Sequence, residues 1–438
     1  MGSYVPTTAA EREQMLAQVG VKSLNDLYAA VPQEMFLHNG LNLPEGLSEL
    51  EVREKVTDLA EKNKVFKTVL RGAGSYRHFI PAVVKSITSR EELVTCYTPY
   101  QAEISQGVLQ GTFEFQTMIC ELTGMDVANA SHYDGATAAA ETIPMCKERK
   151  RNVAYVSETT NPQVIEVMKT YCFASNTELH VVPAKDGKTD AEALKAALGE
   201  NAACFYVQQP NFFGQIEDTV ALGEITHAAG AKFVMGVNPI ACALLPTPRE
   251  VGADVAVGDG QPLGLDTAFG GPYLGFMATT NAMTRKLPGR IVGQTTDVDG
   301  KTGYVLTLSA REQHIRREKA SSNICSNQAL CAFSAGVYMA AMGEKGMKQC
   351  ARLCTSKAHY FASELEKAGC TIKYKGEFFH EFVTEVECPN CRKKILDVLE
   401  AEGILGGAEV EGGILWCVTE LASKAQLDRA VTIVKEVQ

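Results

Sequence analysis

The middle of the chain alternates short apolar runs with helical patterns, and this alternation limits the possible folds more than any other feature. From residue 152 onward the order is strand, helix, strand, helix. Strands separated by helices predict crossover connections and a mainly parallel sheet that is buried on both faces. The successive segments are NVAYVSE, PQVIEVMKTYCFA, ELHVVPA, DAEALKAALG, ACFYVQQ, VALGEITHAAG and KFVMGVN.

The sequence on either side of this region predicts further domains. Two more strand candidates, DVAVGDG and YLGFMAT, flank a glycine-rich turn at residues 268–272, and a long helical stretch covers residues 327–367. The remaining segments are strands CTIKYKG and FFHEFVTEV, helix CRKKILDVLEAEG, strand GGILWCV and helix KAQLDRAVTIVKEV. We therefore predict a helical N-terminal arm (1–65), a large α/β domain (66–310) and a small C-terminal α+β domain (311–438).

Composition excludes several classes of protein. The 438 residues are 45% hydrophobic and 21% charged, as in a globular protein, and no apolar run approaches the roughly 20 residues that span a bilayer. The start of the chain has no signal-peptide pattern. A net charge of -10 disfavours nucleic-acid binding. The 14 scattered cysteines indicate free thiols and a cytoplasmic location, and the pair Cys388–Cys391 is interpreted as a polar turn, so no metal site is predicted.

The domain order is typical of the aspartate-aminotransferase-like fold, fold type I of the enzymes that use pyridoxal phosphate. That chemistry needs a Schiff-base lysine just after a strand. The corresponding segment here, GDGQPLG at 258–264, has none, because no lysine lies between Lys232 and Lys286. The large domain is therefore predicted to be a degenerate cofactor domain. Gly135, in ASHYDGATAAAE, suits a phosphate at a helix N-terminus, or else a glycine turn with close helix packing.

Several strings, in order along almost the whole chain, resemble one family, the glycine cleavage system P-proteins. The match is to the amino-terminal half of the one-chain form, which corresponds to the alpha subunit of the two-chain form. The strings are RGAGSYRHFIPAVV, YTPYQAEISQG, ANASHYDGATAAAE, FGGPYLGFMA, PGRIVGQ and REQHIRREKASSNICSNQ.

The resemblance implies a shared catalyst. In this family the lysine and the covalently bound pyridoxal phosphate belong to a beta subunit, and an alpha2beta2 assembly is expected. Glycine loses its carboxylate as CO2, and its aminomethyl group passes to the lipoyl arm of the carrier H-protein. The missing lysine is then expected of an alpha subunit.

Tyrosine hydroxyls suit a site that is completed across an interface. We expect Tyr97, Tyr100 and Gln101 to complete the active site of the beta subunit; the alternative is that the two tyrosines only pack. Arg77 and His78 are expected to contact glycine or the lipoyl-bearing partner, unless they form a solvated turn.

A basic run in an acidic protein suits acidic partners. We expect Arg311, His314, Arg316 and Arg317 to contact the beta subunit or the carrier; internal ion pairs are the alternative. Cys325, beside this run, is a redox candidate or a small buried hydrophobe.

Two other functions stay open at this stage. The chain can be a catalytically empty scaffold that stabilises or regulates the lysine-bearing subunit. It can also be a self-sufficient pyridoxal phosphate enzyme that uses an unexpected lysine.

Overall fold

The chain folds into two compact units, Met1–Val65 and Phe66–Gln438. The structure, a computed structural model, describes residues 6–97, 99–320 and 322–437. The first unit, which corresponds to the predicted arm, contains helices but no core, since none of its described residues is buried. Its elements are α1 (Ala9–Val19), the 3-10 turns η1 (Leu24–Tyr28) and η2 (Gln33–Met35), and α2 (Glu49–Ala60).

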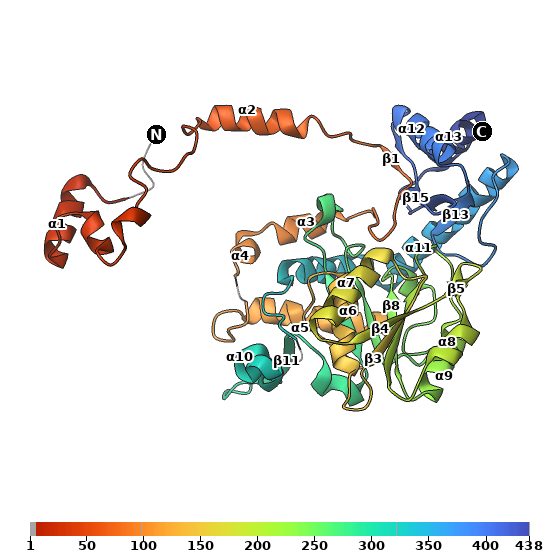
Figure 1. Cartoon of the computed structure of the whole chain (residues 1–438), viewed down its shortest axis with the longest axis horizontal. Helices are drawn as coiled ribbons and strands as arrows, with labels where there is room; N and C mark the ends of the chain where they lie inside the picture. The colour runs from red at the N-terminus through yellow and green to blue at the C-terminus, as the bar shows by residue number, and fades with distance from the viewer. Residues whose placement is uncertain (1–5, 98, 321, 438) are drawn as a thin grey trace. The chain divides into compact units, whose positions relative to one another are not determined.

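A seven-stranded sheet forms the centre of the second unit (Figure 1). Its strand order is β2-β10-β9-β8-β7-β3-β4, and only β10 runs antiparallel to its neighbours. The predicted mainly parallel sheet is therefore confirmed. The strands are β2 (Val127–Ala128), β3 (Val153–Ser157), β4 (Glu178–Val182), β7 (Ala202–Gln209), β8 (Lys232–Val237), β9 (Val255–Asp259) and β10 (Gly275–Thr279).

Apolar side chains on both faces hold this sheet in place. Every residue of β3 is buried, and so is nearly every residue of β7, β8 and β9, as expected for strands with helices on both sides. One core contains Phe205 and Phe233, and the opposite face packs Tyr206 and Val234 against other helices. The helices and 3-10 turns around the sheet are α3 (Ala82–Thr88), α4 (Glu91–Val94), α5 (Gln106–Thr123), α6 (Gly135–Cys146), α7 (Pro162–Ala174), α8 (Ala191–Ala197), α9 (Thr219–Ala228), η3 (Ala241–Ala243), η4 (Ala268–Gly270) and η5 (Asn281–Lys286).

The C-terminal region has its own core around Trp416, which is 1% exposed. The long helix α11 contributes to this core and also to the core of the central sheet, with a break at Gly343, where φ is 59°. The boundary at residue 310 therefore stays a prediction. The elements here are α11 (Ala329–Lys367), β13 (Glu381–Glu385), α12 (Pro389–Ala401), β14 (Ile404–Leu405), β15 (Ala408–Val410), β16 (Gly413–Cys417) and α13 (Lys424–Val437).

Some predicted elements were wrong or missing. The segment CTIKYKG was predicted as a strand, but only Ile372 forms an isolated bridge, to Thr384, at the sheet edge. The sequence analysis also missed the hairpin of β11 (Ile291–Thr296) and β12 (Thr302–Thr307).

Short elements complete the described chain. They are β1 (Thr68–Val69), β5 (Ala184–Lys185), β6 (Lys188–Thr189), η6 (Ser309–Arg311), α10 (Gln313–Arg316) and η7 (Arg317–Lys319). None of the described cysteines forms a disulfide. Among the described residues, no helix combines the length and apolarity that a membrane span requires.

Leu70 ties the start of the second unit into the C-terminal core. Its side chain is 0% exposed within that core, and its backbone bonds to Leu405 and Cys417. We expect Leu70→Ala to lower the free energy of unfolding by about 2–5 kcal/mol, since it leaves a cavity. Urea unfolding measures this change. Leu421→Ala, at a side chain that is 40% exposed, is the control and should cost much less; equal losses would contradict this account.

Candidate functional site

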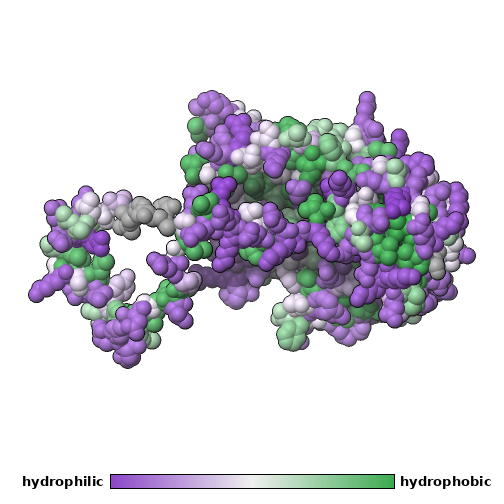
Figure 2. All heavy atoms as spheres, turned by 90° about the horizontal axis from the view of Figure 1, so that it is seen from above, coloured by the Kyte–Doolittle hydropathy of each residue, from purple (hydrophilic) through white to green (hydrophobic). Residues whose placement is uncertain are grey.

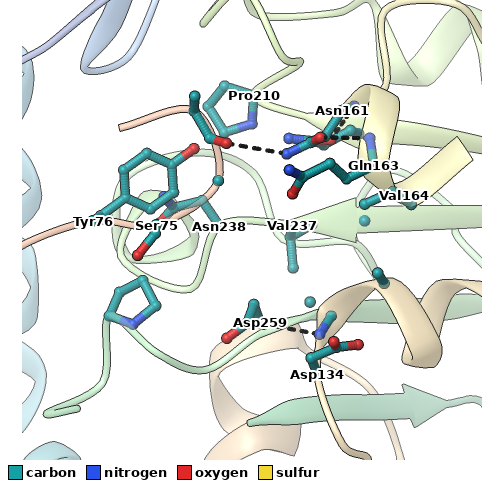
Figure 3. A pocket seen from close by; sticks show the side chains of 18 of the residues that line it. Ser75, Tyr76, Asp134, Asn161, Gln163, Val164, Pro210, Val237, Asn238 and Asp259 are labelled. Atoms are coloured by element: carbon teal, nitrogen blue, oxygen red, sulfur yellow. Dashed lines mark hydrogen bonds between the residues drawn. The ribbon is translucent and has the colours of Figure 1, made fainter. Parts of the chain in front are cut away.

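A cavity of about 450 Å³ lies at the carboxyl ends of the parallel strands. This is where ligands bind in open α/β sheets. Figure 3 shows Ser75 and Tyr76 on one side of this cavity, with Asn161 and Gln163, from the start of α7, across from them. The polypeptide after β1 thus forms one wall, and the ends of β7, β8 and β9 form the floor.

The N-terminus of α6, the predicted phosphate position, is already occupied by carboxylates of this chain. Asp134 caps the helix and accepts a 2.7 Å hydrogen bond from the Thr137 N–H. Asp259, at the end of β9, accepts a 2.9 Å hydrogen bond from the Gly135 N–H (Figure 3). A Cβ on Gly135 would lie 2.8 Å from the Asp259 backbone nitrogen, so glycine is required for this close packing. The helix terminus that could receive an anion is therefore satisfied internally.

An amide occupies the segment where a Schiff-base lysine would be expected. Gln261 is 1% exposed, accepts a hydrogen bond from the Tyr76 N–H at 2.9 Å, and donates to the carbonyl of Tyr76 at 2.8 Å and of Leu265 at 2.9 Å. All three bonds are made to backbone groups. The segment 258–264 is thus used to fix the wall that carries Tyr76.

The cavity is acidic in character. Its described lining contains Asp134, Asp259 and Glu381 and neither lysine nor arginine. Burial raises the pKa of the Asp259 carboxyl to about 6 and that of the Glu381 carboxyl to about 7. Burial also lowers the pKa of the His380 imidazole to about 3, so this ring is neutral at pH 7. No cationic side chain of the described lining is available to hold a phosphate.

The described side chains that line this cavity do not suit pyridoxal phosphate, because none of them is a lysine or an arginine. The two lysines nearest in sequence to the expected position are engaged elsewhere. Lys232 is at the start of β8, the opposite end of that strand from the cavity, and pairs with Asp254 at 2.9 Å. Lys286 pairs with Glu148 at 3.0 Å. A self-sufficient pyridoxal phosphate enzyme thus finds no support in the described residues.

A second group of polar side chains lies around Tyr100, and we call it the Tyr100 cluster: Tyr100, Arg290, Glu312, Cys325 and Asn327. The Arg290 guanidinium lies 4.4 Å from the centroid of the Tyr100 ring and pairs with the Glu312 carboxylate at 3.2 Å. Arg290 also donates to the Cys325 carbonyl at 3.4 Å, and the Tyr100 hydroxyl donates to the side chain of Asn327. Burial raises the pKa of Tyr100 to about 12, so its hydroxyl stays protonated and uncharged at neutral pH.

The cluster borders a hollow and contains polar atoms that have no hydrogen-bond partner among the described residues. The hollow measures about 190 Å³, and Arg290, Glu312, His314 and Cys325 are among its lining residues. Among the buried polar atoms without a hydrogen bond from the described residues are Glu312 Oε1 and Asn327 Nδ2 of the cluster and Nε of the neighbouring Arg311. Buried unpaired polar atoms are costly, so these atoms are candidates for hydrogen bonds to a group that the described residues do not supply.

Hydrogen bonds to the central sheet domain fix the cluster. Gln116 on α5 exchanges two bonds of 2.9 Å with the backbone of Val292, next but one to Arg290. The segment 322–328 is held by bonds from Ser322 to Glu141 at 3.0 Å and from the Gln328 N–H to Ser131 at 3.1 Å. Burial raises the pKa of Glu141 to about 7. The cluster is thus carried by a supported loop.

The structure gives the remaining predicted site residues different environments. Tyr97, Gln101 and Arg77 are exposed. His78 is 6% exposed and bonds to Glu420, which places it inside the fold. Arg316 and Arg317 are exposed; their roles, like those of the other predicted site residues, stay predictions.

Within the basic run, Arg311 points inward. It donates to the Gly289 carbonyl at 2.7 Å, and burial lowers its pKa. His314 lies 3.7 Å from Glu312.

Sequence reasoning missed three members of the Tyr100 cluster. Arg290, Glu312 and Asn327 lie in the quoted strings PGRIVGQ and REQHIRREKASSNICSNQ, but none was singled out. The available signal was that residues of opposite charge, Arg290 and Glu312, occur in two strings that resemble the same family. Opposite charges of this kind can form an ion pair.

Comparison with known proteins extends over the whole chain. The family model for the glycine cleavage system P-protein matches residues 2–434. A curated protein from Desulfitobacterium hafniense, named probable glycine dehydrogenase (decarboxylating) subunit 1, is 47% identical over 447 residues and covers 100% of both chains. A protein of the same name from Moorella thermoacetica is 48% identical over 440 residues and covers 99% of both.

Solved structures agree with these matches. A crystal structure of glycine decarboxylase (P-protein) of the glycine cleavage system, in inhibitor-bound form, superposes with a TM-score of 0.93 at 40% identity and covers 100% of both chains. A Burkholderia pseudomallei sphingosine-1-phosphate lyase has a TM-score of 0.65 at 13% identity, with 94% of each chain covered, and supports the fold alone.

Glu381 should make stability depend on pH. Its folded pKa of about 7 lies above that of a free carboxyl, so folding favours the protonated form and stability falls as the pH rises through the range from about 4 to 7. We expect Glu381→Gln to remove on the order of 3 kcal/mol of this fall, measured by urea unfolding between pH 5 and 8. Glu385→Gln, at an exposed residue of the same strand, is the control. Identical pH profiles for the wild type and Glu381→Gln would refute the assignment.

Proposed function

Because this chain belongs to the glycine cleavage system P-protein family, we propose that it is the alpha subunit of a two-subunit glycine decarboxylase. In that role it acts with a beta subunit to decarboxylate glycine, and the aminomethyl group passes to the lipoyl arm of H-protein. Its relatives are named subunit 1, which supports a second subunit. This activity is that of a glycine dehydrogenase (aminomethyl-transferring, decarboxylating).

The lining of the cavity is the observation that supports different roles for the two subunits. The family has the fold of pyridoxal phosphate enzymes, but this chain places Asp259 against the N-terminus of α6 and Gln261 where a lysine would be needed. We propose that the cofactor is bound by the beta subunit and not by this chain. When bound there, it supplies the electron sink that stabilises charge on glycine as CO2 departs.

This chain contributes the Tyr100 cluster to the composite active site, in our proposal. The side chain of Arg290 is 17% exposed, and its guanidinium is oriented by Glu312. A guanidinium can form two parallel hydrogen bonds to a carboxylate or a phosphate. Tyr100 offers a neutral hydroxyl, oriented by Asn327. The unpaired atoms of Glu312 and Asn327 support a complement from the beta subunit or the substrate. The cluster would position glycine or the cofactor and exclude water from the reacting carbon.

The predicted roles of the other residues continue as parts of this proposal. The exposed Arg316 and Arg317 suit contact with an acidic carrier, the H-protein, and Tyr97 and Gln101 suit the rim of the interface. We further propose an alpha2beta2 assembly. The free thiols support a cytoplasmic enzyme.

The arm supports an obligate complex. Val52, Val56 and Leu59 lie on one face of α2 at helical spacing, and each is at least 45% exposed. Figure 2 shows hydrophobic residues on the surface of this unit. A capping box between Ser48 and Glu51 stabilises the helix without any partner. An apolar face on a unit without a core is suited to pack on the beta subunit.

Substitutions in the Tyr100 cluster separate this function from that of an empty scaffold. We expect Arg290→Lys and Tyr100→Phe to lower the exchange of labelled bicarbonate into glycine by at least about tenfold in the mixture of both subunits, because positioning groups are lost. The affinity between the subunits, measured by sedimentation, should be unchanged. Arg285→Ala, at an exposed arginine, is the matched control. Full exchange activity in both cluster variants would favour the scaffold.

A charge on the arm should weaken assembly. We expect Val56→Asp to raise the Kd for the beta subunit by about tenfold or more, because a buried apolar contact would be replaced by a charge. Thr57→Asp adds the same charge to another face of α2 and serves as the control. If both variants bound the beta subunit like the wild type, the arm would not be an interface element.

A further inference from the structure

Four metal-binding side chains meet in the interior of the second unit, away from the Tyr100 cluster. We call them the His78 cluster: His78, Cys350, Cys354 and Glu420. One potential ligand atom from each residue lies within 4.8 Å of all the others. His78 follows the cavity wall, the cysteines are one turn apart on α11, and Glu420 lies between β16 and α13. Residues 272 positions apart in the sequence are thus brought together.

The distances suit tetrahedral coordination. The Sγ of Cys350 is 3.8 Å from Nδ1 of His78, the Sγ of Cys354 is 3.4 Å from Oε2 of Glu420, and that oxygen is 2.7 Å from the same Nδ1. Bonds from zinc of about 2.3 Å to sulfur and about 2.0 Å to nitrogen or oxygen give ligand-to-ligand distances of about 3.3–3.8 Å in a tetrahedron. The two sulfur distances already have these values. The contact between His78 and Glu420 must open, and the pairs of ligand atoms that lie nearer the 4.8 Å limit must close, when the ion binds.

The surroundings hold the ligands in place. The second carboxylate oxygen of Glu420, Oε1, accepts a 2.6 Å hydrogen bond from the Phe79 N–H, which leaves Oε2 facing the cluster. The Glu420 carbonyl accepts from Lys357, and Thr419 bonds to the Arg77 carbonyl at 2.8 Å. Bonds of this kind, from groups behind the ligands, orient them for a metal.

Burial and chemistry favour a metal in this cluster. Cys350 is 3% exposed and Cys354 is 0% exposed, and the side chain of Glu420 is 11% exposed. Two thiolates, an imidazole and a carboxylate form a donor set that zinc prefers. Four protein ligands leave no open position, which is typical of a structural site.

We propose that His78, Cys350, Cys354 and Glu420 bind one zinc ion that fastens the cavity wall to α11 and to the C-terminal core. This departs from the sequence analysis, which predicted no metal site. The ion would hold the polypeptide that carries Tyr76, whose ring lies 4.6 Å from that of His380 in the cavity. The site therefore gives shape to this chain without taking part in the chemistry of the beta subunit.

The test is metal analysis of the full-length chain, purified without a polyhistidine tag after zinc supplementation. We expect about one zinc ion per chain in the wild type and less than about one tenth in Cys350→Ser/Cys354→Ser. Cys388→Ser/Cys391→Ser removes the exposed cysteine pair and should keep the full zinc content, so it is the matched control. Zinc that is absent from the wild type, or that depends on Cys388 and Cys391, would overturn the proposal.

A second measurement uses the wild-type chain, in case the cysteine variant does not fold. After zinc is exchanged for Co²⁺, we expect the intense visible bands of tetrahedral cobalt and a thiolate-to-cobalt charge-transfer band in the near ultraviolet. Both should persist in Cys388→Ser/Cys391→Ser. A chelator should lower the thermal midpoint, and added zinc should restore it. A spectrum of octahedral, water-bound cobalt would contradict a closed site at the His78 cluster.

Discussion

The hydrogen bond from the Gly135 N–H to the Asp259 carboxylate limits which ligands the cavity of this chain can bind. It occupies the N-terminus of the helix at the carboxyl ends of the strands, where a phosphate group would otherwise be received. With Gln261 bonded to the backbone of Tyr76, the fold retains the architecture of a cofactor domain but closes its cofactor position. In our proposal the beta subunit therefore binds the cofactor, and this chain contributes through the features that face outward.

Three features of the chain fit a role in an enzyme of two subunits. The Tyr100 cluster holds an arginine, a tyrosine and unpaired polar atoms at the edge of a hollow, as expected of half of a site. The arm presents an apolar helix face that its own unit does not cover. The His78 cluster joins the cavity wall to α11 and the C-terminal core, so it supports the shape of the chain.

Much of the fold could be predicted from the sequence because its strands are buried on both faces. ACFYVQQ and KFVMGVN are almost continuously apolar, and they are β7 and β8 in the structure. Amphipathic or exposed elements gave weaker signals. The hairpin β11–β12 was missed because half of β11 is exposed, and CTIKYKG failed as a strand because it touches the sheet only at Ile372.

The candidate sites were harder to predict from the sequence than the fold. Tyr100 was proposed as a site residue from its string, and its role stays a prediction. The pairing of Arg290 with Glu312 and the contact between His78 and Cys350 join distant segments, so the sequence did not indicate them.

The central claim is that catalysis belongs to the pair of subunits and not to this chain. The most direct measurement is the exchange of labelled bicarbonate into glycine, with pyridoxal phosphate and lipoylated H-protein present. It compares this chain alone, the beta subunit alone and the two together. The account predicts exchange at a substantial rate only in the mixture. Exchange by this chain alone would contradict it, because the described cavity offers neither a lysine nor a cationic phosphate site.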